Sequence, residues 1–416
     1  METIKVINYV IMVIFFACYA YQFLYIPIAW LKKQKPLPKG LLHRYAVLIA
    51  ARNEETVIGS LIESIKRQNY PADRIDIYVI ADNCTDCTAK AAKSHSATVF
   101  ERFDKVRIGK GYALNYLLGR IKKIYDAYLV FDADNVVDKN FVREINKTFY
   151  AGYDIVTSYR NSKNYGDNWI SSGYGLWFLR EAQYLNRPRA VLGASCGVSG
   201  TGFLFSRRIL EQCGGWNFFL LTQDIEFTAH NIANGEKIGY CPDAVFYDEQ
   251  PTGFRQSFRQ RMRWVQGYLQ VLRRYGVKLI KGCFRGSFSC FDMLMNIAPA
   301  AILAWVSVII NIASAIFRFA NGADVLTVLS SIGQSLLNLC LTVFILGLIT
   351  TISEWKQIRC SVWRKILAAV TFPLFMLTYL PVTVAALICK PEWKPITHSK
   401  RISVEELACS GKERSL

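Results

Sequence analysis

Two carboxylates stand one residue apart in LVFDADN at 129–135, directly after an apolar run. In an extended chain, residues i and i+2 point to the same side, so Asp132 and Asp134 would converge just beyond a buried strand. Carboxylates placed so close together repel one another unless they share a proton or a cation. Although D-x-D alone also occurs in many turns, this pair is predicted to bind Mg²⁺ or Mn²⁺ bridged to a diphosphate.

A third carboxylate, Asp224, lies near the start of a predicted helix in TQDIEFT at 222–228. A helix cap is the ordinary role of Asp at such a position. The alternative is a general base that removes a proton from an acceptor hydroxyl, which requires a carboxylate held close to that hydroxyl.

A basic and aromatic segment, FRQSFRQRMRWVQG at 254–267, places Gln260, Arg263 and Trp264 at i, i+3 and i+4. These residues would share one face of a helix. The guanidinium group can grip phosphate oxygens, and the indole offers a flat apolar surface for a sugar ring. The same pattern is typical of a helix lying at a membrane interface, which would bring such a site to the membrane.

Short apolar or β-branched runs alternate with helical patterns over the first part of the chain, which predicts an α/β domain with a mostly parallel sheet. The runs lie at 45–50, 75–81, 97–103, 127–132 and 154–159. Ligands of such sheets bind outside the carboxyl ends of the strands. Polar and acidic residues gather at these ends: Arg52, Asn53 and Glu54 after the first run, Asp82 and Asn83 after the second, and Asp132 and Asp134 after the fourth.

Long uncharged stretches flank this region. Residues 6–30 contain no charged side chain and are long enough to cross a bilayer, and further uncharged stretches lie at 293–316, 325–352 and 366–389. The lysines and arginines of 31–44 favour the cytosolic side. The predicted organisation is a transmembrane anchor at 1–31, a cytosolic domain at 43–250, amphipathic interface helices at 251–288, transmembrane segments at 289–390 and a basic tail at 391–416.

Three full crossings after the cytosolic domain would leave the basic tail outside, against the charge rule. Pro373 and Pro381 interrupt the last stretch, so a re-entrant hairpin that returns the tail to the cytosol is an alternative. The formal net charge of +18 is explained by basic residues that flank membrane segments and face anionic headgroups. No nucleic-acid partner is expected, because no nucleic-acid-binding motif accompanies the charge.

At these motifs the sequence resembles the membrane-integrated family 2 glycosyltransferases, which include hyaluronan, chitin-oligosaccharide, poly-N-acetylglucosamine and cellulose synthases. The resemblance covers about residues 45–270 and depends on seven motifs in order: ARNEE, ADNCTD, KGYALN, FDADN, SGTGFLFSRR, TQDIEF and QRMRW. QRMRW agrees with the Q-x-x-R-W pattern of chain-building members. Gln223 is a departure, because the family usually has Glu before the catalytic Asp.

The resemblance implies a GT-A-like domain with an N-terminal anchor and a C-terminal transmembrane bundle. It also implies roles for individual residues. Asp224 would be the catalytic base of an inverting transfer, and Asp132 and Asp134 would hold the sugar nucleotide and its metal. The remaining implied residues are Ala51, Asn53, Glu54 and Asp82 for the nucleoside, Lys110 for the diphosphate, and Gln260, Arg263 and Trp264 for the diphosphate and the acceptor.

The function implied is transfer of sugar from a UDP-sugar to a growing β-linked polysaccharide, processive and coupled to export across the plasma membrane, with the catalytic domain in the cytosol. UDP-N-acetylglucosamine and UDP-glucose are the donors that the resemblance favours. One alternative is a non-processive enzyme that adds one sugar to a membrane lipid. A distant alternative is a transporter with a sugar-nucleotide sensor, which the uncharged membrane stretches disfavour.

Overall fold

The structure is a computed structural model that describes residues 18–32, 37–38, 40–298, 325–389 and 400–401, with short pieces at 9–10, 13–14, 16, 312–313, 316–317, 319–320 and 406. Much of the predicted anchor, the stretch at 299–311 and most of the predicted tail lie outside the described residues. The side of the membrane on which the tail lies therefore stays a prediction.

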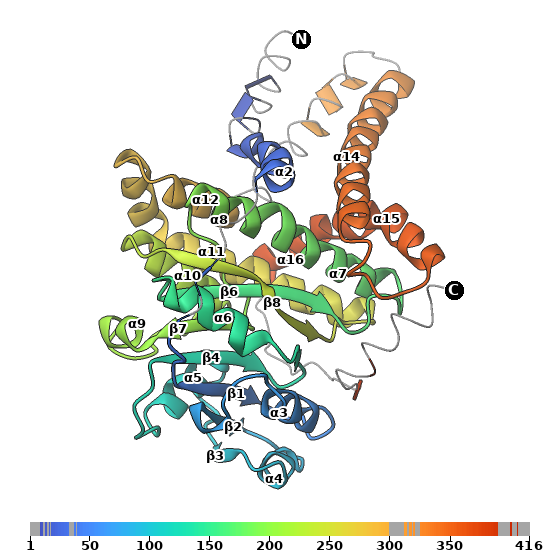
Figure 1. The fold of residues 1–416 in the computed structure, drawn as a ribbon. Coiled ribbons are helices and arrows are strands. Elements are labelled where there is room, and N and C mark those ends of the chain that lie inside the picture. Colours follow the sequence, from blue (N-terminus) through green and yellow to red (C-terminus); the bar gives the residue numbers. More distant parts are fainter. Residues whose placement is uncertain are drawn as a thin grey trace.

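A mixed eight-stranded sheet in the order β3-β2-β1-β4-β7-β6-β8-β5 forms the centre of the molecule (Figure 1). Its strands are β1 (Tyr45–Ala51), β2 (Ile75–Asp82), β3 (Thr98–Arg102), β4 (Ala127–Asp132), β5 (Val136–Val137), β6 (Ile155–Ser162), β7 (Phe203–Ser206) and β8 (Ile238–Asp248). The five strands expected from sequence are confirmed. The half from β3 to β4 is parallel, as is the pair of β6 and β8, whereas β7 is antiparallel to both its neighbours.

Strand β1 is buried on both faces, as a near-continuous apolar strand of a parallel sheet should be. Ala46 and Leu48 pack into one apolar cluster, and Val47 and Ile49 into another on the opposite face. The second cluster is completed by α3 (Ile58–Lys66), α4 (Thr88–Ser94) and α6 (Phe141–Tyr150). The first includes residues of α5 (Lys110–Leu118), α7 (Trp169–Glu181) and α10 (Gln223–Ala233).

The segment that enters β7 requires glycine. Gly200 and Gly202 have φ angles of 81° and 64°, which side-chain-bearing residues rarely adopt. A Cβ atom on Gly202 would also lie 2.2 Å from the ring of Phe246. The segment lies against the end of β4, where the Gly202 amide donates to the Val130 carbonyl at 2.8 Å and the Asp132 amide donates to the Thr201 hydroxyl at 2.9 Å.

Several long or continuous helices lie outside the sheet. A capping box of Asn168 and Ser171 begins α7, which continues through a π-helical turn (Ala182–Asn186) into α8 (Arg187–Leu192). The region predicted to hold amphipathic interface helices contains the 31-residue helix α11 (Phe254–Phe284), which is followed by α12 (Phe288–Ile297).

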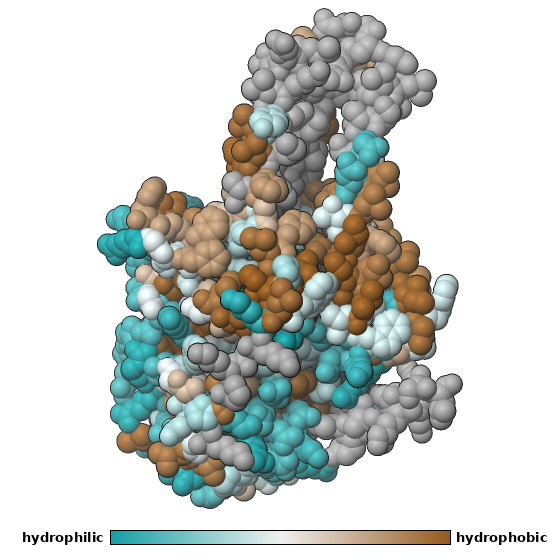
Figure 2. Space-filling view, turned by 45° about the horizontal axis from the view of Figure 1, so that its top comes forward, coloured by the Kyte–Doolittle hydropathy of each residue, from teal (hydrophilic) through white to brown (hydrophobic). Residues whose placement is uncertain are grey.

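Apolar helices gather at one end of the molecule: α2 (Tyr21–Leu31), α14 (Val325–Ser353), α15 (Val362–Leu377) and α16 (Tyr379–Ile388). Within the described residues, Leu336–Ser353 and Val362–Ile388 are long and apolar enough to cross a membrane. Hydrophobic surface gathers over this end, and hydrophilic surface over the β1–β3 end (Figure 2). Its exposed apolar side chains include Phe23, Leu24, Trp30, Leu337, Leu341, Ile345, Ile352, Trp363, Ile366, Val370 and Leu374.

The two prolines expected to break the last stretch behave differently. Pro373 lies inside α15, whereas the chain leaves one helix and begins the next at Thr378. Pro381 then stands in the first turn of α16, where its missing amide hydrogen removes no intrahelical bond.

Candidate active site

A cavity of about 740 Å³ opens at the carboxyl ends of β1, β2 and β4 and extends between α7, α11 and the apolar helices α14–α16. Ten of the eleven residues predicted to form the site line it: Ala51, Glu54, Asp82, Lys110, Asp132, Asp134, Asp224, Gln260, Arg263 and Trp264. Asn53 is not among its lining residues. Segments separated by more than two hundred residues therefore form one site.

Asp132, the last residue of β4, faces the cavity, and its side chain is 39% exposed. Its carboxylate accepts a hydrogen bond from the ammonium group of Lys110, the first residue of α5. The same ammonium group donates to the carbonyl oxygen of Gly200 at 2.8 Å. Lys110 thus joins β4 to the glycine-rich segment before β7.

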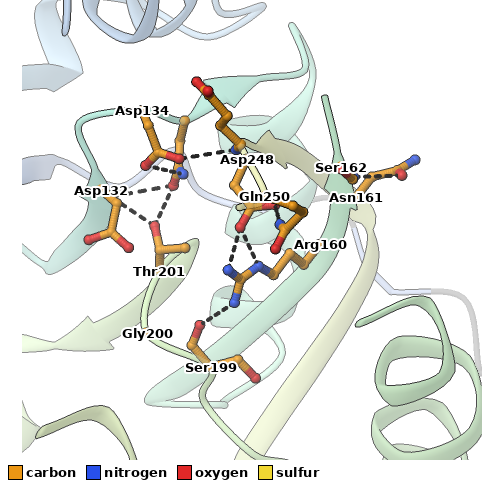
Figure 3. Close-up of polar contacts among 12 residues, drawn as sticks. Asp132, Asp134, Arg160, Asn161, Ser162, Ser199, Gly200, Thr201, Asp248 and Gln250 are labelled. Carbon is orange, nitrogen blue, oxygen red and sulfur yellow. Dashed lines mark hydrogen bonds and ion pairs between the residues drawn. The ribbon is translucent and has the colours of Figure 1, made fainter. Parts of the chain in front are cut away.

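Asp134 does not continue the extended chain, so the alternation expected of residues 132 and 134 is wrong. The chain turns after Asp132, whose carbonyl accepts the amide of Asn135 at 3.1 Å. The Asp134 carboxylate is buried and accepts the Glu249 amide at 3.0 Å and the Asn135 side chain at 3.3 Å. Figure 3 shows the Asp132 carboxylate pointing away from this network.

The chemistry of these side chains fits a hard divalent cation, since both line the cavity and offer carboxylate oxygens. In the described part of the chain, no group of three or more His, Cys, Asp or Glu side chains is arranged to hold a metal ion. Mg²⁺ commonly takes one or two carboxylates from the protein and further oxygens from a substrate phosphate. Of the two carboxylates, that of Asp132 is the more accessible.

Asp224 stands in the first turn of α10, beside the glycine that contacts Lys110. Its Oδ2 lies 3.5 Å from the point that a Cβ atom on Gly200 would occupy. Loss of hydration raises the pKa of Asp224, and the neighbouring charge of Lys110 opposes that rise. A partly buried carboxyl with a raised pKa at the cavity wall has the properties of a general base.

The helix α11 presents Gln260, Arg263 and Trp264 to the same cavity. Loss of hydration lowers the pKa of Arg263, against the opposing charges of Asp224 and Asp132. The indole of Trp264 packs edge-on against Tyr174 at 5.7 Å between ring centroids. The Oε1 atom of Gln260 is buried without a hydrogen-bond partner among the described residues, and faces a site that could supply one.

Sequence reasoning missed a buried ion pair at the centre of the site (Figure 3). Arg160 donates from Nε to Asp248 Oδ2 at 2.7 Å, and Gln250 donates to Asp248 Oδ1 at 2.6 Å. The Arg160 guanidinium also donates to the Ser199 carbonyl at 3.1 Å and stacks 3.6 Å from the ring centroid of Phe178. The available signal was the polar DEQ sequence that begins at the last residue of β8, which resembles the polar ends of β1, β2 and β4.

The residues predicted to hold the nucleoside have protein partners as well. The Asn53 side chain exchanges two hydrogen bonds with Thr85, at 3.0 and 2.8 Å, and so braces the loops after β1 and β2. Asp82 is buried and accepts a 2.5 Å bond from Arg102. Their nucleoside contacts stay a prediction.

The cavity at the strand ends, with its carboxylates and basic side chains, is the arrangement of a nucleotide-dependent group-transfer enzyme. Residues 43–267 match the family described as Glycosyltransferase like family 2, and the chain belongs to that family.

Curated relatives include enzymes with different products. A probable glycosyltransferase, YdaM, of Bacillus subtilis is 27% identical over 279 residues, which cover 61% of this chain and 60% of the relative. A beta-monoglucosyldiacylglycerol synthase of Synechocystis is 29% identical and covers 54% and 47%. A poly-beta-1,6-N-acetyl-D-glucosamine synthase of Staphylococcus epidermidis is 24% identical and covers 70% and 71%. This chain thus spans about half to three fifths of the first two.

Among solved structures, the mannosyltransferase PcManGT from Pyrobaculum calidifontis, in complex with GDP-Man and Mn²⁺, is similar with a TM-score of 0.60. The two chains are 17% identical, and the match covers 92% of this chain and 99% of that one. This similarity shows the fold, a GT-A-like domain with a mixed sheet.

Proposed function

We propose that this enzyme transfers a sugar from a UDP-sugar to the hydroxyl group of a membrane-bound acceptor, with inversion at the anomeric carbon. The observation that carries the proposal is the joint placement of Asp132, Lys110, Asp224 and Arg263 around one cavity. That cavity continues to the apolar helices, so a polar donor and an apolar acceptor can meet in it.

In this proposal the donor lies at the ends of β1, β2 and β4, next to Asp82 and Lys110. Asp132 and Asp134 would hold Mg²⁺ or Mn²⁺, which when bound neutralises charge on the diphosphate. Lys110 and Arg263 supply further positive charge to the diphosphate as it leaves. Such fixed charges stabilise a leaving group best where water is excluded.

Asp224 would take the proton of the acceptor hydroxyl. The acceptor oxygen then forms a bond to the anomeric carbon, while the bond from that carbon to the diphosphate oxygen breaks and its electron pair leaves with UDP. Attack from the face opposite the leaving group inverts the configuration. An α-linked donor therefore gives a β-linked product.

A lipid acceptor is supported by the wall of the cavity. Leu339, Val343 and Leu346 of α14 and Phe372 and Met376 of α15 line it together with the polar site. A growing polysaccharide with coupled export is the second candidate, and the Q-x-x-R-W pattern at 260–264 favours it. In both, the protein is an integral membrane protein of the plasma membrane with its catalytic domain in the cytosol.

The test uses the purified full chain in a neutral detergent with a panel of radiolabelled UDP-sugars and lipid extract. Incorporation of one sugar per lipid supports the lipid acceptor, and a product ladder or high polymer supports the polysaccharide. Absence of transfer and of UDP release with every donor would contradict both. Asp243→Asn, a change of an exposed carboxylate on β8, provides a control for the site variants.

A further inference from the structure

The cavity is also lined by Arg180, an arginine that the proposed transfer reaction does not use. Arg180, near the end of α7, donates to the side-chain oxygen of Gln22 on α2 at 3.3 Å, and its guanidinium carbon lies 5.3 Å from the ring centroid of Trp177. In the part of the chain that the structure describes, no carboxylate lies within salt-bridge distance of Arg180. Its charge is therefore not neutralised locally.

The nearest ionic groups are engaged elsewhere. Glu181 accepts a hydrogen bond from the Ser199 hydroxyl. Arg189 is held by Asp292, at 2.5 Å from Nε and 3.3 Å from a second nitrogen, and Asp292 also accepts the Tyr21 hydroxyl at 2.6 Å. Burial and the charge of Arg189 lower the pKa of Arg180 to about 10, so the group stays positively charged at neutral pH.

The cavity that Arg180 lines also has an apolar wall. Trp177, Arg180 and Gln22 line it together with apolar side chains of α14 and α15, namely Leu339, Val343, Leu346, Phe372 and Met376. Both helices also expose apolar side chains on the outside of the molecule (Figure 2). A cation beside an apolar wall suits a ligand that has an anionic head and hydrocarbon chains.

The Arg180 region and the general base belong to the same cavity. Tyr268 and Trp264 of α11 line this cavity together with Arg180 and Asp224. A ligand headgroup bound at Arg180 can therefore extend within one cavity toward Asp224.

We propose that the acceptor is an anionic phospholipid, whose phosphate pairs with Arg180 while its hydroxyl group reaches Asp224 and its acyl chains lie against α14 and α15. This inference depends on the proposed sugar transfer and names the class of its acceptor. Arginine suits the role because its guanidinium stays charged and binds phosphate oxygens in a forked geometry. A neutral lipid in the cavity would leave the charge of Arg180 without a counter-ion once water is displaced.

Binding is measured with the delipidated full chain in a neutral maltoside detergent, by native mass spectrometry. The probes are dioleoylphosphatidylglycerol, dioleoylglycerol with the same chains and no phosphate, and glycerol phosphate without chains. We expect the phospholipid to bind about tenfold or more tightly than dioleoylglycerol, as the loss of a charge-assisted bond predicts. Glycerol phosphate should bind weakly, because it lacks the chains.

Variants then assign the effect to one side chain. Arg180→Gln should weaken phospholipid binding about tenfold, whereas Arg180→Lys should retain most of it. Arg285→Gln, which removes an exposed charge at the end of α11, should bind like the wild type. UDP protection against thermal unfolding should be the same in all four proteins, which shows that the donor site is intact.

Equal affinity of the wild type for dioleoylphosphatidylglycerol and dioleoylglycerol would overturn the inference, and that comparison requires no variant to fold. Unchanged phospholipid binding by a folded Arg180→Gln protein would also overturn it. Binding of glycerol phosphate as tight as that of the phospholipid would refute the lipid part. Failure of UDP to protect any of the proteins would instead contradict the proposed transferase function.

Discussion

The ammonium group of Lys110 contacts both the Asp132 carboxylate and the Gly200 carbonyl. Its positive charge therefore lies next to the carboxylate that is expected to bind the metal. Lys110 neutralises Asp132 in this arrangement. Binding of a metal and a diphosphate would require Lys110 to exchange this carboxylate for phosphate oxygens.

The first prediction concerns the metal. EDTA should abolish sugar transfer by the wild type, and Mn²⁺ or Mg²⁺ should restore it. Asp132→Asn should lower transfer by about 100-fold or more, because fixed charge at a leaving group is worth several kcal/mol. The control Asp243→Asn should keep wild-type rates. Full transfer in EDTA would show that the carboxylate pair serves a purpose other than metal binding.

The second prediction concerns Asp224. Asp224→Asn should lower kcat by about 10² to 10⁴ and leave UDP binding unchanged, because general-base catalysis is lost. Since the pKa of Asp224 is raised, wild-type kcat should decrease as the pH is lowered, and the decrease should begin at a higher pH than it would for a base with the pKa of an ordinary aspartate. Undiminished transfer by the asparagine variant would refute the assigned base.

The raised pKa of Asp224 also affects how the stability of the fold depends on pH. A carboxyl whose pKa is raised on folding stabilises the fold most below its unfolded pKa, and this contribution is lost as the pH rises through the folded pKa. Asp224→Asn should therefore match or exceed the wild type in Tm at pH 8, and the difference should shrink at pH 4. If the Tm of the variant minus that of the wild type were lower at pH 8 than at pH 4, the raised pKa would be contradicted.

The third prediction concerns Glu226, which is fully buried in the first turn of α10. It accepts the Leu220 amide at 2.8 Å and the Arg274 guanidinium at 2.7 Å, and thereby holds the loop that leads into Asp224. Glu226→Ala should reduce the free energy of unfolding by about 1–3 kcal/mol, because a buried amide loses its acceptor. It should also lower kcat.

The control for Glu226 is Glu211→Ala. Glu211 is exposed on α9 (Arg207–Gln212) and pairs with Arg207 at the surface, so its loss should change the free energy of unfolding by less than about 0.5 kcal/mol. Denaturant titration in detergent measures both variants. Equal effects of the two changes would show that Glu226 does not position the loop.

The fourth prediction concerns Arg160 and Asp248. Their side chains are 17% and 4% exposed, so Arg160→Ala would leave a buried carboxylate without its cation, at a cost of about 3–5 kcal/mol in unfolding free energy. Adding Asp248→Asn should recover part of this loss. A double-mutant cycle measures the coupling, and additive effects would show that the pair is not coupled.

The parallel half of the sheet could be predicted because its signals are local. Each strand from β1 to β4 is a compact apolar run, and a helical pattern separates most of them. Their parallel order then brings Asp82 and Asp132 to one rim, as the sequence suggested.

The other half could not be predicted from local patterns. Strand β8 contains Pro242 and exposed Asp243, and its pairing with β6 shifts register between Ser158 and Tyr159. The sequence therefore gives no continuous apolar run there, and Asp248 at the end of β8 was missed.

The predicted orientation of Asp134 was wrong for a similar reason. The turn after Asp132 is held by Asn135, which accepts the hydroxyl of Thr201, a residue 66 positions further along the chain. A contact between such distant residues is invisible to a rule based on strand alternation.

The antiparallel strand β7 has four residues and is hydrogen-bonded to both β4 and β6. It therefore joins the half of the sheet that carries Asp132 to the half that carries Arg160. A circular permutant with its new termini between residues 197 and 206 would break the chain on one side of β7. The two halves of the sheet would then lose their common register.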